Sequence, residues 1–155
     1  MIYPKLISAA LMLFLAACAA FPRTGNPADG NADGDGPSER VFGTTEYYGE
    51  PAQVQVPASV EQGQPFAVTV VTYGNGCIDK GETKVEVEAF RAEVRPYDYD
   101  TSLLNPICND ELRQHQHTAT LSFGEAGTAE VVFHGLKQDA SGVTQTSVTR
   151  TVRVR

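Results

Sequence analysis

Two histidines separated by one residue, His115 and His117, are the first side chains in this sequence that could do chemistry together. In an extended strand, residues two positions apart point to the same face, so both imidazoles would lie side by side. Imidazole nitrogens are common ligands of zinc and copper, and His134, Asp110 and Glu111 are candidates for further ligands. We expect the pair either to begin a small metal site or to be two polar residues at the start of a strand.

A second arrangement alternates aromatic and acidic side chains over Tyr97, Asp98, Tyr99 and Asp100. Such a string could offer ring faces and carboxylates to a sugar or to a basic partner. The chain has no tryptophan, which weakens the carbohydrate hypothesis. We place the string in a long irregular connection over residues 95–110, where the alternative is a solvated loop.

Sequence motifs of enzymes are missing from the chain. It contains no G-x-S-x-G, no H-E-x-x-H and no glycine-rich phosphate loop. The paired carboxylates of a hydrolase have no local motif, so a hydrolase with unrecognised carboxylates stays as a third hypothesis. We expect a protein that is not an enzyme and that carries no cofactor.

The N-terminal residues have the pattern of a targeting signal. Lys5 and the terminal amine form a short positive region, and residues 6–17 are apolar and uncharged. As a helix this apolar run would span roughly 18 Å, well short of a hydrocarbon core of about 30 Å. A signal peptide is therefore favoured over a permanent transmembrane anchor.

The string Leu15-Ala16-Ala17-Cys18 closes the apolar run and resembles the lipobox of bacterial lipoprotein signal peptides. The resemblance implies that the thiol of Cys18 takes a diacylglycerol, that residues 1–17 are removed, and that the new amine is acylated, for example with palmitate. It also implies that Ala19 directs the protein to the outer membrane. We therefore expect a bacterial envelope protein that faces the periplasm or the cell surface and is held on its membrane through Cys18.

Two cysteines remain once Cys18 is assigned to lipid, namely Cys77 and Cys108. An even pair in an exported chain predicts a disulfide. The alternatives are a metal pair or a catalytic thiol working with His115 or His117. The chain has no C-x-x-C motif, which favours the disulfide.

Composition limits the partners and the number of domains. Without residues 1–17 the chain keeps 138 residues, enough for one domain. Loss of Lys5 leaves 11 of the 12 basic residues against 19 acidic ones, a net charge of −8. Nucleic-acid binding needs a basic excess and is excluded, whereas another envelope protein is a suitable partner.

Two further segments follow the signal peptide. Residues 18–45 are rich in Gly, Asp, Asn and Pro and poor in apolar side chains, which is typical of a flexible tether. From residue 46 to residue 155, short alternating segments separated by Gly, Pro and Asp turns predict a β domain. Within it, the apolar phase of Val85, Val87 and Ala89 differs by one from that of Phe90 and Ala92, which predicts a bulge or a break at residues 89–90.

The fold class predicted by these segments is all-β, and helical periodicity appears nowhere after residue 17. The strand that begins at Pro65-Phe66 and the late glycine turn before Ala129-x-Val131-x-Phe133 resemble the immunoglobulin-like domains of bacterial surface proteins. The resemblance implies a Greek-key β-sandwich of about seven strands, here with one disulfide.

The function that these observations favour is a structural or protein-interaction role for a lipid-anchored envelope domain. The alternative is a small periplasmic metal-binding domain that uses His115 and His117. A hydrolase comes third.

Overall fold

The computed structural model describes residues 38–105 and 107–155, and in these ranges the protein is all-β, as predicted. The strands are β1 (Glu39–Phe42), β2 (Thr44–Tyr47), β3 (Val54–Gln55), β4 (Ser59–Val60), β5 (Phe66–Gly74), β6 (Ile78–Glu88), β7 (Arg91–Asp100), β8 (Arg113–Leu121), β9 (Gly127–Asp139) and β10 (Gly142–Val154). Among the described residues, none forms a helix with the length and hydropathy of a membrane span. The predicted signal peptide, Cys18 and the tether up to residue 37 lie outside the described residues.

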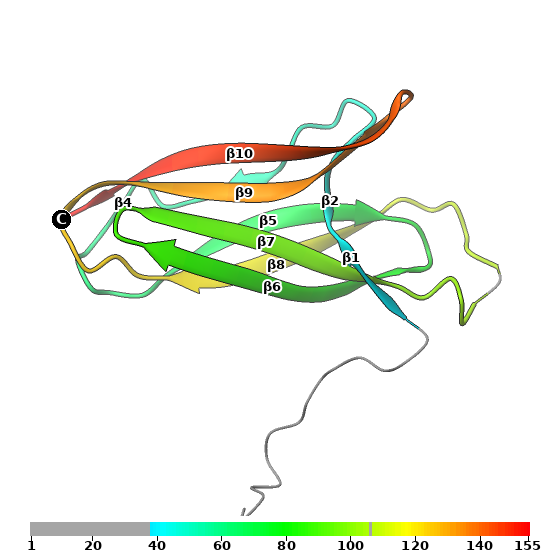
Figure 1. Cartoon of the computed structure of the whole chain (residues 1–155), viewed down its shortest axis with the longest axis horizontal. Helices are drawn as coiled ribbons and strands as arrows, with labels where there is room; N and C mark the ends of the chain where they lie inside the picture. The colour runs from blue at the N-terminus through cyan, green and yellow to red at the C-terminus, as the bar shows by residue number, and fades with distance from the viewer. Residues whose placement is uncertain (1–37, 106) are drawn as a thin grey trace, which may run out of the picture. The chain divides into compact units, whose positions relative to one another are not determined.

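One curled sheet contains all of these strands (Figure 1). On one side β6, β7, β9 and β10 follow one another, with β4 at the edge beside β10; on the other side β5 lies between β8 and β3. β2 links the two sides because it pairs in parallel with β9 and antiparallel with β5. The immunoglobulin-like Greek-key arrangement within the all-β class stays a prediction.

The core lies between the two sides of the curled sheet. Alternate residues of β5, β7, β8, β9 and β10 point inward, as expected for strands with one buried face. The buried cluster contains Val68, Val70, Ala92, Val94, Ala119, Leu121, Phe123, Ala129, Val131, Phe133, Val152 and Val154. Ala119, Leu121 and Phe123 share one inward face, and so do Ala129, Val131 and Phe133.

The predicted break at residues 89–90 is confirmed. β6 ends at Glu88, β7 begins at Arg91, and these two residues pair across a two-residue hairpin turn. Ala89 has a φ of 43°, in the left-handed region that such turns require. The shift in apolar phase is therefore the point where the chain reverses.

The tether was expected to extend to residue 45, and this boundary is wrong. β1 pairs with the second half of β7, and β2 carries the buried side chain of Thr45. Between them, Gly43 donates its N–H to the carbonyl of Pro96 at 3.0 Å, and a Cβ on Gly43 would lie 2.5 Å from Cγ2 of Thr72. The domain therefore includes the chain from residue 39 onward.

The irregular connection predicted over residues 95–110 is also wrong in its first half, because β7 continues to Asp100. Pro96 is tolerated inside the strand because the ladder on one side is interrupted there. On that side β9 pairs only with residues 91–94 and β1 only with residues 97–100; on the other side Pro96 pairs with Thr83, next to a register shift between Lys80 and Thr83. A missing N–H costs little at such a position.

Candidate functional site: the disulfide-bearing end

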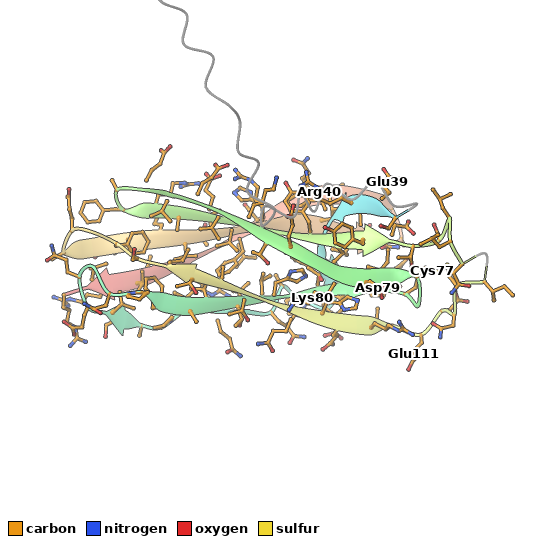
Figure 2. The ribbon with its side chains drawn as sticks, turned by 90° about the horizontal axis from the view of Figure 1, so that it is seen from below. Glu39, Arg40, Cys77, Asp79, Lys80 and Glu111 are labelled. Atoms are coloured by element: carbon orange, nitrogen blue, oxygen red, sulfur yellow. A yellow bond between two sulfur atoms is a disulfide. The ribbon has the colours of Figure 1, made fainter. Side chains whose placement is uncertain are left out.

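The end of the domain where β5 turns into β6 carries the predicted disulfide. Cys77 follows this turn, and Cys108 lies in the loop between β7 and β8. Their sulfurs are bonded and their Cα atoms lie 5.2 Å apart, which confirms the pairing. Figure 2 shows Cys77, Asp79 and Glu111 together at this end, and Figure 1 places the C-terminus at the opposite end.

The loop between β7 and β8 is held to this turn by backbone hydrogen bonds as well as by the disulfide. Thr101 donates both its N–H and its hydroxyl to the carbonyl of Cys77, each at 2.8 Å. Gly76 donates its N–H to the carbonyl of Asn109 at 3.0 Å. Within the loop, Leu104 donates its N–H to the carbonyl of Thr101 at 2.9 Å, which forms a tight turn. The described residues on both flanks of the disulfide are therefore fixed to the turn by hydrogen bonds.

This ordered loop presents large apolar side chains to solvent. The exposed fractions are 79% for Leu103, 56% for Leu104, 81% for Ile107 and 45% for Leu112. We call these four residues the apolar tip. Single exposed apolar residues are normal on a protein surface, but several within ten residues of one loop are typical of an interaction site.

Four acidic residues lie at the same end of the domain as the apolar tip. Asp100 ends β7, Asp79 follows the disulfide, and Asp110 and Glu111 precede β8; we call these four residues the acidic rim. None of the four makes a salt bridge with another described residue.

Of the two arginines near this end, only Arg40 pairs with a carboxylate. The guanidinium of Arg40 lies 2.6 Å from a carboxylate oxygen of Glu82 and 4.5 Å from the centroid of the Tyr97 ring. Arg113 donates to the carbonyl of Gly76 at 3.5 Å. Arg113 keeps its positive charge at this end, and Lys80 beside Asp79 makes no salt bridge with a described residue. The four carboxylates of the acidic rim exceed these two positive charges, so this end carries a net negative charge.

The predicted binding string does not form a loop. Tyr97, Asp98, Tyr99 and Asp100 belong to β7, where successive side chains point to opposite faces. The ring of Tyr97 packs against Phe42 on the outside, at 5.4 Å between centroids, whereas Asp98 is buried inside the sheet. The loop predicted for these four residues is therefore wrong, and they do not form one exposed surface, because the strand turns Tyr97 outward and Asp98 inward.

Asp98 instead belongs to a buried polar network with His117. The Nε2 of His117 lies 3.0 Å from Oδ1 of Asp98 and 3.2 Å from the hydroxyl oxygen of Thr72, and Nδ1 lies 3.0 Å from the hydroxyl oxygen of Thr83. The side chains of His117 and Asp98 are 0% and 1% exposed. The short distance to a carboxylate requires a proton on Nε2, which donates to Oδ1. Oδ2 of Asp98 has no partner among the described residues.

The two histidines point to the same face of β8, as predicted, but they bind different groups. His115 places Nε2 at 3.0 Å from the carbonyl oxygen of Ile78, while His117 is enclosed by the buried network. Among the described residues no group of three or more His, Cys, Asp or Glu side chains could hold a metal. His134 lies on β9 next to Glu93, and Asp110 and Glu111 lie on the acidic rim. The candidate ligands are therefore not brought together around the histidines.

A group of charged residues covers the outer face of β6, β7 and β9. Glu93 lies 3.3 Å from Arg91 and 3.4 Å from Nε2 of His134, and it also contacts Arg95. Partial burial of Glu93 acts to raise its pKa, but the hydrogen bond from Arg91 and the positive charges of Arg95, His134 and Arg91 outweigh it, so its pKa is lowered. The contacts are typical of a solvated sheet face that is stabilised by ion pairs.

Comparison with known proteins gives no match to any family model, curated protein sequence or solved structure.

Proposed function

We propose that this chain is a lipid-anchored envelope protein whose β domain binds another envelope protein through the apolar tip. The observation that carries the proposal is the ordered exposure of Leu103, Leu104 and Ile107 on a disulfide-clamped loop. Burial of apolar surface against a partner would stabilise the complex by roughly 25 cal/mol per Å². A loop fixed in that state is already arranged for a partner and loses little conformational entropy on binding.

The charges around the tip favour a protein partner over a lipid surface. An anionic membrane would repel the acidic rim, whereas an apolar pocket edged by Lys or Arg complements it. We therefore assign the tip to a basic-edged apolar pocket on the partner. Insertion of the tip into the bilayer is the outcome that would contradict this assignment.

The point where the chain enters the β domain supports a partner that lies close to the membrane. Glu39 pairs with Asp100, so the described chain enters the domain beside the loop that carries the tip. Treated as the glycine-rich coil predicted from the sequence, the roughly 20 residues between Cys18 and Glu39 have a root-mean-square span of about 25 Å. A domain anchored through Cys18 would reach only partners on or near its own membrane.

Site-specific photo-cross-linking in intact cells tests this proposal. A photo-reactive amino acid is placed at Leu104 and, as a matched control, at Val87, an exposed apolar residue near the hairpin at the other end of β6. We expect a discrete protein adduct from position 104 that Leu103→Asp abolishes, and none from position 87. Equal adducts from both positions, or adducts only with lipid, would refute the assignment to a protein partner.

A vesicle experiment distinguishes a lipid surface from a protein partner. The purified protein without its lipid is mixed with phosphatidylethanolamine and phosphatidylglycerol vesicles and sedimented. We expect it to stay in the supernatant. Co-sedimentation that Leu104→Asp abolishes would show that the tip is a membrane contact.

A further inference from the structure

A small pocket at the disulfide-bearing end is separate from the apolar tip. It has a volume of about 210 Å³ and lies between the start of β2, the β5–β6 turn and the end of β9. Its lining includes Thr44, Tyr47, Tyr73, Asn75, Ile78 and Gln138. None of its lining residues is charged.

Two tyrosines form an aromatic wall of this pocket. The rings of Tyr47 and Tyr73 are stacked, with centroids 6.0 Å apart and an angle of 26° between their planes. Tyr73 is buried and its hydroxyl accepts a hydrogen bond from Nε2 of Gln53 at 2.8 Å, which fixes the ring. The wall is therefore preformed.

Neutral polar groups complete the lining. Asn75 accepts the N–H of Cys77 with Oδ1 at 2.9 Å, so its NH₂ group remains for a ligand. Gln138 and Thr44 add a second amide and a hydroxyl. Aromatic faces next to uncharged donors and acceptors match a sugar ring, which has one face of C–H groups and an edge of hydroxyls.

The backbone beside the pocket carries an independent sign of function. Tyr48 and Gly49 have φ values of 45° and 95° at the centre of a turn that Tyr47 and Glu50 close with two hydrogen bonds. Such a type I′ turn favours Asn-Gly, and a bulky side chain at its first central position is strained.

Burial of the Tyr48 ring does not offset this backbone strain. Tyr48 is 57% exposed and meets the ring of Tyr47 edge-on, at 4.8 Å between centroids. Strain that persists at an exposed aromatic residue is typical of a binding site.

From these observations we propose that the pocket binds one ring of a neutral oligosaccharide, with Tyr47 under the C–H face and Tyr48 at the rim. Its volume is below the roughly 300–1,000 Å³ of pockets for drug-sized ligands, which suits one ring of a longer chain. The affinity for a short oligosaccharide should be roughly millimolar. A proline-rich peptide also binds aromatic side chains, but it needs an extended groove. Here Tyr47 and Tyr73 line one small pocket, and Tyr48 packs against Tyr47.

Backbone NMR titration of the purified, oxidised full-length chain tests the proposal. The probes are tetramers of β-1,4-linked N-acetylglucosamine, glucose and mannose, and a decaproline peptide. We expect at least one tetramer to shift the amide signals of Tyr47, Asn75 and Gln138, and decaproline to shift none of them. No shift with any tetramer at 10 mM (of the order expected for such weak binding), or shifts of the same signals by decaproline, would overturn the proposal.

Two variants separate binding from folding. Tyr47→Ala should weaken sugar binding at least tenfold. Tyr48→Asn should raise the melting temperature by a few degrees, because Asn suits the turn, and should still weaken binding several-fold. Val87→Thr, far from the pocket, should change neither. A Tyr48→Asn protein that is more stable and binds the sugar unchanged would refute the role of Tyr48, and unchanged binding by Tyr47→Ala would refute the site.

Discussion

The buried pair of Asp98 and His117 should contribute strongly to stability, and removing one partner should expose this contribution. In Asp98→Ala, Nε2–H of His117 loses its acceptor at 3.0 Å and keeps only the hydroxyl of Thr72 at 3.2 Å. Both side chains are almost fully enclosed, so bulk water does not reach Nε2–H.

The expected loss of stability depends on whether His117 becomes an unpaired buried donor or an unpaired buried charge. A buried donor without its acceptor costs about 1–3 kcal/mol, and a buried charge without its partner about 3–5 kcal/mol. We therefore expect Asp98→Ala to lower the free energy of unfolding by about 2–5 kcal/mol at pH 7. Asp98→Asn keeps an oxygen for Nε2–H and should lose less.

A double-mutant cycle measures the coupling. His117→Leu alone should also destabilise, because it leaves the buried carboxylate of Asp98 without its donor. The double variant should lose at least about 1 kcal/mol less than the sum of the two single losses, since no unpaired group then remains. Urea unfolding with unchanged m-values is the assay. Additive losses within about 0.5 kcal/mol would refute an energetic link between the two side chains.

Three other changes have expected outcomes. Cys77→Ser with Cys108→Ser should lower the free energy of unfolding by about 3–4 kcal/mol, because a 31-residue separation is no longer closed in the unfolded chain, and equal urea midpoints for this variant and the parent would contradict it. Glu93 has a lowered pKa, so its contribution is complete above its ordinary pKa of 4.5 and is lost as the pH falls through the lowered value. Glu93→Gln should therefore reduce stability at pH 7 and flatten the acid limb of a stability–pH curve, and parallel curves would argue against the ion pairs. Ala89→Gly should raise the melting temperature, because φ is 43° there and glycine adopts this value without strain; a lower melting temperature would contradict the turn geometry.

The sequence predicted those features that depend on side-chain alternation. The phase shift at Ala89 and Phe90 marks the hairpin because a strand has a period of two, and a shift of one cannot continue on the same face. The disulfide followed from the number of cysteines.

Features that depend on distant pairing could not be predicted. Proline and acidic residues usually mark loops and predict one around Asp98, yet the strand continues there because it pairs with β1, which lies far from it in the sequence, as well as with the preceding strand β6. The partner of Asp98, His117, was identified as a candidate ligand, but only the fold shows which residues on β5, β6 and β7 face it.

The sequence does contain a sign of the apolar tip. Leu103, Leu104 and Ile107 lie between two strands, in a segment without the alternation of a strand. Apolar side chains in such a segment do not belong to the buried face of a strand, so exposure could be expected. The β1 and β2 strands were missed because they are four residues long and follow a segment of tether composition.

Hydroxyl-radical footprinting of the apolar tip, in intact cells and in the purified protein, shows whether a partner covers the tip in the envelope. Oxidation of Leu103, Leu104 and Ile107 is compared with that of Val87, which is exposed at the other end of the domain and serves as the internal reference. A covered tip predicts severalfold lower oxidation in cells than in the purified protein, with Val87 unchanged. Equal oxidation of the tip in both samples would contradict the proposal that it contacts a partner in the envelope.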